Sequence, residues 1–298
     1  MADLPAISAV IANRDGADLL PRILPPLLEE LPPDRHEILV IDDASEDGSV
    51  ALVHRDFPAV RVIALPGNVG FGEACNRGFQ EARHDVVLLL NSDMEVTPGS
   101  VEVLAEHFAD AEVFAAGPEF TEPGEETGLV DDGRGTVRPT IGAPAGGGLF
   151  SRGKFVELGG FDRLYHPFYW EDVDLGWNAW RRGWRIVRDA RACFVHLGSA
   201  TINRLYSRQY VARVRARNRY LFGWKNFQTP RLRQRHLAVM MRRILADLVR
   251  RGDAASLLAL FDAWRLRARV KPTAMEARRT EEQVVADARL DVERLLRV

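Results

Sequence analysis

Short apolar runs and amphipathic segments alternate through the first part of the chain. The runs are typical of buried strands, and the longer segments have helical spacing. Strands are predicted at residues 7–13, 37–41, 60–65, 85–90 and 113–116, and helices at 19–31, from the glycines of 67–72 to about 83, and from 98 to about 109. This alternation indicates an α/β fold with a mostly parallel, Rossmann-like central sheet and helices on both faces.

The later part of the chain continues this mixture and ends in helices. Val173, Trp177 and Trp180 are spaced i, i+4, i+7, which predicts a helix that begins near Glu171. Short strands are expected at 185–187 and 192–195, a mobile loop at 122–138, and a final charged helix at 276–298. Two more amphipathic helices are marked by Leu237, Met241, Ile244 and Leu248, and by Leu257, Leu258, Phe261 and Trp264.

Prolines and glycines disturb two of these segments. Pro25 and Pro26 are expected to interrupt the first helix, since proline lacks the N–H that a helix interior needs. Gly146, Gly147 and Gly148 follow one another, which fits either a close approach of the backbone to a ligand or a plain tight turn.

Composition indicates a globular protein, with 46% hydrophobic and 28% charged residues among 298. No apolar run approaches the ~18 residues that a membrane-spanning helix needs. Residues 1–15 lack the basic segment and apolar core of a signal peptide. Cys75 and Cys193 are the only cysteines, which favours a reducing, cytoplasmic setting.

The net charge of −2 conceals an uneven distribution. Residues 204–298 contain 23 Lys and Arg against 9 Asp and Glu, whereas the remainder contains 17 against 33. The basic helices predicted at 231–271 are interpreted either as a solvated helical hairpin or as a surface that lies on anionic lipid at the inner face of the cell membrane. They contain no recognised nucleic-acid-binding motif, so no nucleic acid partner is expected.

Polar clusters follow three of the predicted strands: Asn13-Arg14-Asp15, Asp42-Asp43 and Asn91-Ser92-Asp93. Ligands bind outside the carboxyl ends of strands in such sheets, so these clusters predict one shared pocket. Asp93 together with one distant ligand such as His196 would suffice for Mg²⁺ or Mn²⁺ when a substrate diphosphate supplies further oxygens. The glycines of 67–72 do not have the order of the dinucleotide-binding motif, and no Walker A sequence is present.

An aromatic run ending at Trp170 precedes three carboxylates, Glu171, Asp172 and Asp174. They fit the first turn of a helix, where the backbone N–H groups favour negative charge. They equally fit a general base held against an aromatic wall. The residues alone leave both interpretations open.

Five segments, in this order, resemble the family 2 glycosyltransferases of the GT-A fold, and most closely their rhamnosyltransferase-like branch. They are Asn13-Arg14, Asp42-Asp43-Ala44-Ser45 to Ser49, Asn68 to Gly78, Asn91-Ser92-Asp93, and Gly160-Phe161-Asp162 through Leu175. The resemblance implies a GT-A domain at 1–226, with a nucleotide-binding part at about 1–116 and an acceptor and catalytic part at about 140–226. Residues 227–298 would form a basic helical extension.

The resemblance also implies a role for each matching position. Asn13, Asp42, Asp43, Asn68, Gly70, Asn76 and Ser92 would bind the donor nucleotide, Arg217 and Lys225 the diphosphate, and Asp93 and His196 the metal. Asp172 would be the catalytic base, with Glu171 beside it, and Trp170, Gly147 and Gly148 would contact the acceptor. Two positions depart from the family pattern: Ala12 replaces a frequent aromatic residue, and Asn91 replaces the first carboxylate of the Asp-x-Asp motif.

The implied reaction is an inverting, metal-assisted single displacement. A sugar, with dTDP-L-rhamnose as the expected donor, would pass from a nucleoside diphosphate to a hydroxyl of a glycan or lipid-linked glycan in polysaccharide or cell-wall assembly. The alternatives are a sugar-nucleotide nucleotidyltransferase and a non-catalytic scaffold that binds sugar nucleotides. The first should have a longer Gly-rich, basic loop after the first strand than Asn13 to Gly16, and only turnover excludes the second.

Overall fold

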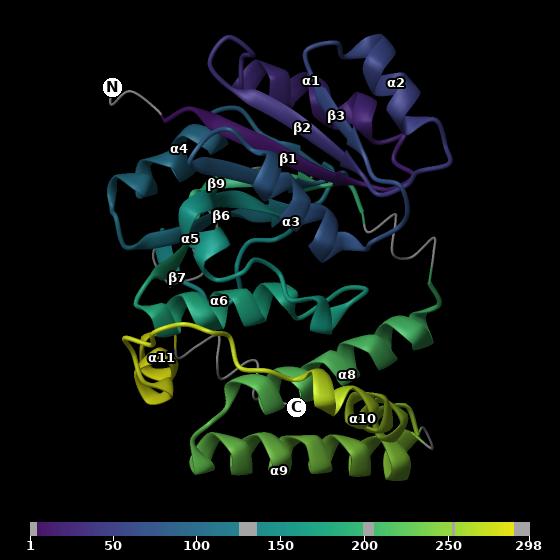
Figure 1. Ribbon diagram of the computed structural model, residues 1–298, viewed down its shortest axis with the longest axis vertical. Coiled ribbons are helices and arrows are strands. Elements are labelled where there is room, and N and C mark those ends of the chain that lie inside the picture. Colours follow the sequence, from purple (N-terminus) through teal and green to yellow (C-terminus); the bar gives the residue numbers. More distant parts are fainter. Residues whose placement is uncertain (1–4, 125–135, 199–205, 252–253, 289–298) are drawn as a thin grey trace.

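The computed structural model describes residues 5–124, 136–198, 206–251 and 254–288 (Figure 1). These residues form a nine-stranded sheet of order β3-β2-β1-β4-β8-β6-β9-β5, with β7 paired to β9. The strands are β1 (Ile7–Asn13), β2 (Glu37–Asp42), β3 (Arg61–Ala64), β4 (Val86–Asn91), β5 (Met94–Val96), β6 (Val113–Thr121), β7 (Val137–Pro139), β8 (Gly147–Ser151) and β9 (Arg185–His196). β3, β2, β1 and β4 run parallel, as do β6 and β9, while β8 is antiparallel to β4 and β6.

Helices cover both faces of this sheet, which confirms the predicted fold class. One face carries α1 (Leu20–Glu30), α2 (Ser49–Asp56) and α4 (Ser100–Glu106), and the other carries α3 (Phe71–Glu81), α5 (Arg152–Glu157) and α6 (Glu171–Arg182). Ala9 and Ile11 of β1 belong to the first core and Val10 to the second, because successive side chains of a strand point to opposite faces. Strands buried on both faces explain the continuous apolar runs in the sequence.

The expected helical extension lies below α6 in Figure 1. It consists of α9 (Pro230–Ala246), α10 (Ala255–Leu266) and α11 (Glu281–Asp287), which follow α8 (Arg208–Asn226) of the preceding part of the chain. α8 packs against α6 on one side and against α9 and α10 on the other. Within the described residues, no helix combines the length and the apolar character needed to cross a membrane.

Some predictions of local structure were wrong. Pro25 and Pro26 lie inside α1 without ending it, and the buried Ile23, Leu24 and Leu27 hold this helix to the sheet. Of the three successive glycines, Gly146 lies in a turn, whereas Gly147 and Gly148 begin strand β8. The two strands expected at 185–187 and 192–195 are the single strand β9.

The final helix begins later than predicted, at Glu281, after Thr280 caps it. Its expected continuation at 289–298 lies outside the described residues, as does most of the loop predicted at 122–138.

Candidate active site

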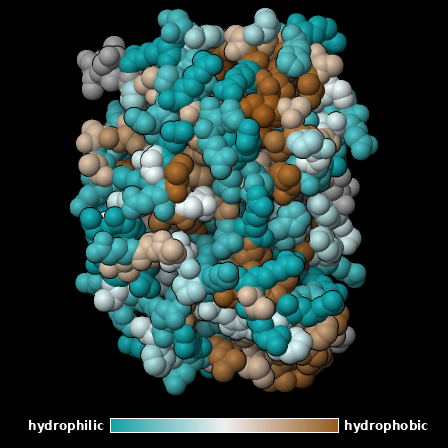
Figure 2. All heavy atoms as spheres, in the orientation of Figure 1, coloured by the Kyte–Doolittle hydropathy of each residue, from teal (hydrophilic) through white to brown (hydrophobic). Residues whose placement is uncertain are grey.

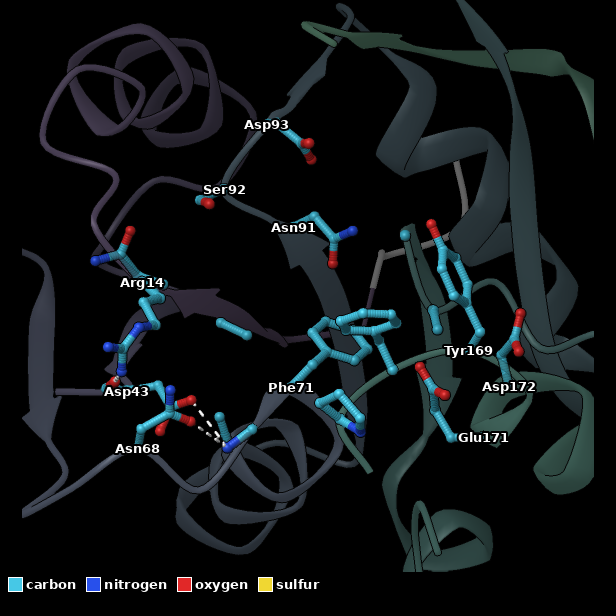
Figure 3. A pocket seen from close by; sticks show the side chains of 18 of the residues that line it. Arg14, Asp43, Asn68, Phe71, Asn91, Ser92, Asp93, Tyr169, Glu171 and Asp172 are labelled. Carbon is cyan, nitrogen blue, oxygen red and sulfur yellow. Dashed lines mark hydrogen bonds between the residues drawn. The ribbon is translucent and has the colours of Figure 1, made fainter. Parts of the chain in front are cut away.

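A pocket of about 360 Å³ lies at the carboxyl ends of β1, β2 and β4. The loop before α3 and the segment 167–172, which leads into α6, complete its wall. Figure 3 shows Arg14, Asp43 and Asn68 on one side of the pocket, Tyr169, Glu171 and Asp172 on the other, and Phe71 and Asn91 between them. The structure therefore brings the predicted strand-end clusters and the predicted carboxylate pair into one cavity.

Asn13 and Asp42 join the turn after β1 to the turn after β2. Asp42 accepts hydrogen bonds from Asn13 Nδ2 at 2.9 Å, from Ser45 Oγ at 2.6 Å and from Ser45 N at 3.0 Å. Asn13 Oδ1 is buried in the pocket wall and has no hydrogen-bond donor within the described part of the chain. An unpaired buried acceptor is costly, so a ligand that donates to Asn13 is favoured. Asp42 does not line the pocket; it positions Asn13.

Asp43 holds the loop before α3. Its carboxylate accepts the backbone N–H of Val69 at 2.6 Å and of Gly70 at 3.0 Å, and Arg14 Nη1 donates to its backbone oxygen at 2.7 Å. Gly70 has φ +85°, and a Cβ there would lie 2.6 Å from the His166 ring. Asn68, which accepts from the same N–H of Gly70 at 3.0 Å, also lines the pocket. Glycine is thus required where this loop meets the segment before α6.

Asp93 and His196 meet through the pairing of β5 with β9. Met94 lies opposite His196 in this antiparallel pair, and Leu197 N donates to Asp93 O at 2.8 Å. His196 Nε2 consequently lies 3.6 Å from Asp93 Oδ2. Burial raises the pKa of Asp93, although His196 opposes this shift.

Two oxygens at this end of β4 are buried without a hydrogen-bond partner in the described structure, Asn91 Oδ1 and Asp93 Oδ1. Oxygen and imidazole nitrogen are suitable ligands for a divalent cation. No group of three or more His, Cys, Asp or Glu side chains with metal-binding geometry occurs among the residues described. Asp93 and His196 therefore fit a cation whose remaining ligands come from a substrate.

Glu171 and Asp172 are the first two residues of α6, and both line the pocket. Burial, and secondarily the charge of Asp172, raises the pKa of Glu171 to about 8. Burial also raises the pKa of Asp172, against the opposing effects of nearby backbone N–H groups and of Arg215. Tyr169 and Trp170, immediately before the helix, have positive φ values of 70° and 80°. Strained backbone of this kind is held in place by surrounding contacts.

Asn218 of α8 supplies those contacts. Its fully buried Nδ2 lies 2.7, 2.9 and 2.8 Å from the backbone oxygens of Tyr165, Phe168 and Tyr169. Arg215, one helical turn earlier, lies over the Tyr169 ring at 4.3 Å from its centroid. Sequence reasoning did not single out Asn218 or Arg215 as site residues, because the alternating arginines from 213 to 219 do not show which side of α8 faces the pocket.

The two cations predicted to bind the diphosphate, Arg217 and Lys225, do not line this pocket. Lys225 is buried and donates to Asp162 at 2.6 Å and Asp174 at 2.7 Å. Burial alone would lower the pKa of Lys225, but the two carboxylates outweigh it and raise the pKa. Arg217 donates to the backbone oxygen of His166 and to Asn218 Oδ1. Neither cation lines the pocket, whereas Arg14 does.

Four other residues that were predicted to contact a ligand have structural roles: Trp170, Asn76, Gly147 and Gly148. The half-buried Trp170 packs on Phe222 with ring centroids 5.2 Å apart and does not line the pocket. Asn76 bonds both backbone polar groups of Phe161, at 2.8 and 2.9 Å. Gly147 and Gly148 allow close packing, since a Cβ there would lie 2.8 Å from Phe194 and 2.6 Å from Pro144. Gly146 and Tyr169 line the pocket in their place, and Ser92 lines it as predicted.

Comparison with solved structures defines the fold class. The structure of GalNAc-T7 with UDP, GalNAc and Mn²⁺ aligns with a TM-score of 0.67 and 16% identity over 99% of this chain and 58% of that one. The mannosyltransferase PcManGT from Pyrobaculum calidifontis, with GDP-Man and Mn²⁺, aligns with a TM-score of 0.60 and 17% identity over 98% of this chain and 88% of that one. The fold is therefore the GT-A glycosyltransferase fold.

Sequence comparison then shows which glycosyltransferases the chain is similar to. Residues 8–144 match the family model described as Glycosyl transferase family 2. N-acetylglucosaminyl-diphospho-decaprenol L-rhamnosyltransferase of Mycobacterium tuberculosis (strain ATCC 25618 / H37Rv) is 25% identical over 53% of this chain and 66% of its own length. Succinoglycan biosynthesis protein ExoO of Rhizobium meliloti (strain 1021) is 36% identical over 36% of this chain and 31% of its own length. The chain thus matches less than two thirds of either curated relative.

Proposed function

We propose that this protein is an inverting family 2 glycosyltransferase that moves a sugar from a nucleoside diphosphate to a hydroxyl of a glycan or lipid-linked glycan. The observation that carries the proposal is the single pocket that contains Asn13, Asp43, Asp93, Glu171 and Asp172. The matched family model and the GT-A fold support it. In this proposal residues 1–226 are the transferase domain and residues 227–298 a helical extension.

The donor nucleotide would lie on the side of Arg14, Asp43 and Asn68 (Figure 3). Arg14 is the arginine that lines this wall among the described residues, and it would face the diphosphate. Mg²⁺ or Mn²⁺ would bind through Asp93 and His196, which fit because Asp93 Oδ1 is buried and unpaired among the described residues. When bound, the cation would neutralise charge on the leaving diphosphate.

The acceptor would lie on the side of Tyr169, where Asp172 takes the proton of its hydroxyl. When two adjacent carboxyl groups lie in different environments, one keeps its proton and the other ionises. Glu171, with a pKa of about 8, keeps its proton at neutral pH, and Arg215 favours the ionised form of Asp172. Asp172 is therefore the base of the pair. A base opposite the leaving diphosphate gives inversion at the anomeric carbon.

The variant Asp172→Asn tests this assignment because it keeps the shape of the side chain and removes the proton acceptor. We expect donor binding to persist and nucleoside diphosphate release to fall by ~10²–10⁴-fold. Asp56→Asn, on α2 and exposed, is the matched control and should retain full turnover. Turnover of Asp172→Asn at the wild-type rate would refute the assignment.

The donor is best identified by thermal shift with nucleoside diphosphate sugars and Mg²⁺ or Mn²⁺. A ligand at 100 times its Kd stabilises the fold by about 2.7 kcal/mol. We propose dTDP-L-rhamnose as the donor, on the basis of the rhamnosyltransferase relative. Turnover separates the alternatives, since a nucleotidyltransferase releases pyrophosphate and a scaffold binds the donor without releasing product.

A further inference from the structure

α9 and α10 carry apolar residues on two sides, and only one side serves the fold. The inner side of α9 buries Leu232, Val239, Met240 and Ile244. Its outer stripe leaves Leu237, Met241 and Leu245 exposed by 57%, 55% and 62%, and Leu248 of the π-helical turn that follows (Asp247–Arg251) continues the stripe with 42% exposed. On α10 the buried side is Ser256, Ala259 and Ala263, and the outer stripe is Leu257, Phe261 and Trp264, exposed by 46%, 54% and 51%.

These two outer stripes form what we call the apolar face. Figure 2 shows brown, hydrophobic side chains gathered along the lower edge of the molecule, over α9 and α10. Isolated exposed apolar residues are ordinary, but successive turns of two helices with outward apolar side chains mark an interaction surface.

Cationic side chains accompany the apolar face. Arg231, Arg235 and Arg242 share one flank of α9, spaced i, i+4, i+11, and all are exposed. On α10, Arg265 lies 5.9 Å from the Phe261 ring centroid, and the neighbouring Arg267 lies 3.9 Å from that of Trp264. Arginine and aromatic side chains beside an apolar stripe are characteristic of helices that lie in a membrane interface.

Acidic residues do not offset these charges in the described part of α9, α10 and their connection. Asp262 accepts from Arg213 at 2.6 and 2.8 Å, and the buried Asp247 accepts from Ser256 Oγ. A two-fold dimer through this surface would bring the arginines of both copies to one interface without bringing acidic partners for them from the described part of α9 and α10. An anionic lipid surface complements them.

We infer that the apolar face docks this protein onto an anionic lipid bilayer, with α9 and α10 lying in the interface. The apolar stripes enter the headgroup region while the flanking arginines contact lipid phosphates. The inference is independent of the proposed enzymatic function, because docking requires neither donor nor acceptor.

Sedimentation with lipid vesicles tests it. The full chain should bind vesicles of phosphatidylcholine and phosphatidylglycerol in equal amounts, and bind pure phosphatidylcholine much less. Phe261→Ser with Trp264→Ser should lower the partition coefficient by at least about tenfold. Arg235→Glu with Arg242→Glu should lower it by at least about fivefold for each arginine removed, and high salt should do the same to the wild type.

Matched controls and a second measurement keep the test decisive. Val156→Ser on α5 and Arg55→Glu on α2 change exposed residues outside the apolar face and should leave binding unchanged. The substituted residues are exposed, so circular dichroism and melting temperature should match the wild type. Absence of vesicle binding, equal binding by the variants, or a lipid-free dimer that Phe261→Ser with Trp264→Ser converts to a monomer would each overturn the inference.

Discussion

Glu171→Gln should stabilise the protein at high pH and leave its stability unchanged at low pH. The folded protein raises the pKa of Glu171 from 4.5 to about 8, chiefly by burial. Between these two values the folded state keeps a proton that the unfolded chain has lost, so stability falls as pH rises. Above the pKa that Glu171 has in the folded protein, this loss of stability is complete. Glutamine is neutral at every pH and removes this dependence.

The size of the effect follows from the pKa. Each pKa unit corresponds to about 1.4 kcal/mol, so a rise from 4.5 to about 8 approaches 5 kcal/mol as an upper limit. Because Asp172 titrates with Glu171, we expect about half of this limit. For a chain of this size, 2–3 kcal/mol raises the melting temperature by roughly 4–10 °C.

The assay is urea or thermal unfolding of wild type and Glu171→Gln at pH values spaced from 4.5 to above 8. The two stability curves should coincide at the acidic end and diverge as pH rises. Glu102→Gln, on α4 and exposed, is the control that should follow the wild type. Parallel curves for wild type and Glu171→Gln would show that Glu171 is ionised in the folded protein.

Two further substitutions test the supports of the pocket. Gly70→Ala should lower stability by about 1–3 kcal/mol and weaken donor binding, because φ at Gly70 is +85° and the new Cβ would meet His166. The control Gly67→Ala should be tolerated, since the space around Gly67 is open. Lys225→Met should destabilise by roughly 3–5 kcal/mol in urea unfolding, because the buried Asp174 loses its cationic partner, whereas the exposed Lys271→Met should have no effect. Wild-type stability of Gly70→Ala or Lys225→Met would contradict these roles.

The sequence predicted the part of the fold that local pattern determines. β1, β2 and β4 are continuous apolar runs that end in polar residues, so both the strands and the cluster at Asn91 to Asp93 could be located. β8 could not, because Gly147 and Gly148 have no side chains that would reveal a strand. α1 continues through Pro25 and Pro26 because its buried leucines outweigh the missing hydrogen bonds.

Residue roles that depend on long-range packing could not be predicted from the sequence. Arg217, Asn218 and Lys225 are close together in the sequence, and pattern alone cannot tell which of them faces a ligand. The structure directs Lys225 to two carboxylates and Asn218 to the segment before α6. In each case the deciding partner lies 49 or more residues away along the chain.

The segment before α6 shows why positioning Glu171 and Asp172 requires residues from distant parts of the chain. Tyr169 and Trp170 have left-handed backbone conformations, which bulky residues adopt only when neighbouring contacts impose them. Asn218 supplies those contacts from α8 by bonding carbonyl groups of the segment. The resulting turn starts α6 at the pocket, so that the buried Glu171 and the half-buried Asp172 both line it. α8 thus acts on the proposed chemistry in two ways, since Asn218 holds the segment before α6 and the charge of Arg215 opposes the rise in the pKa of Asp172 that burial causes.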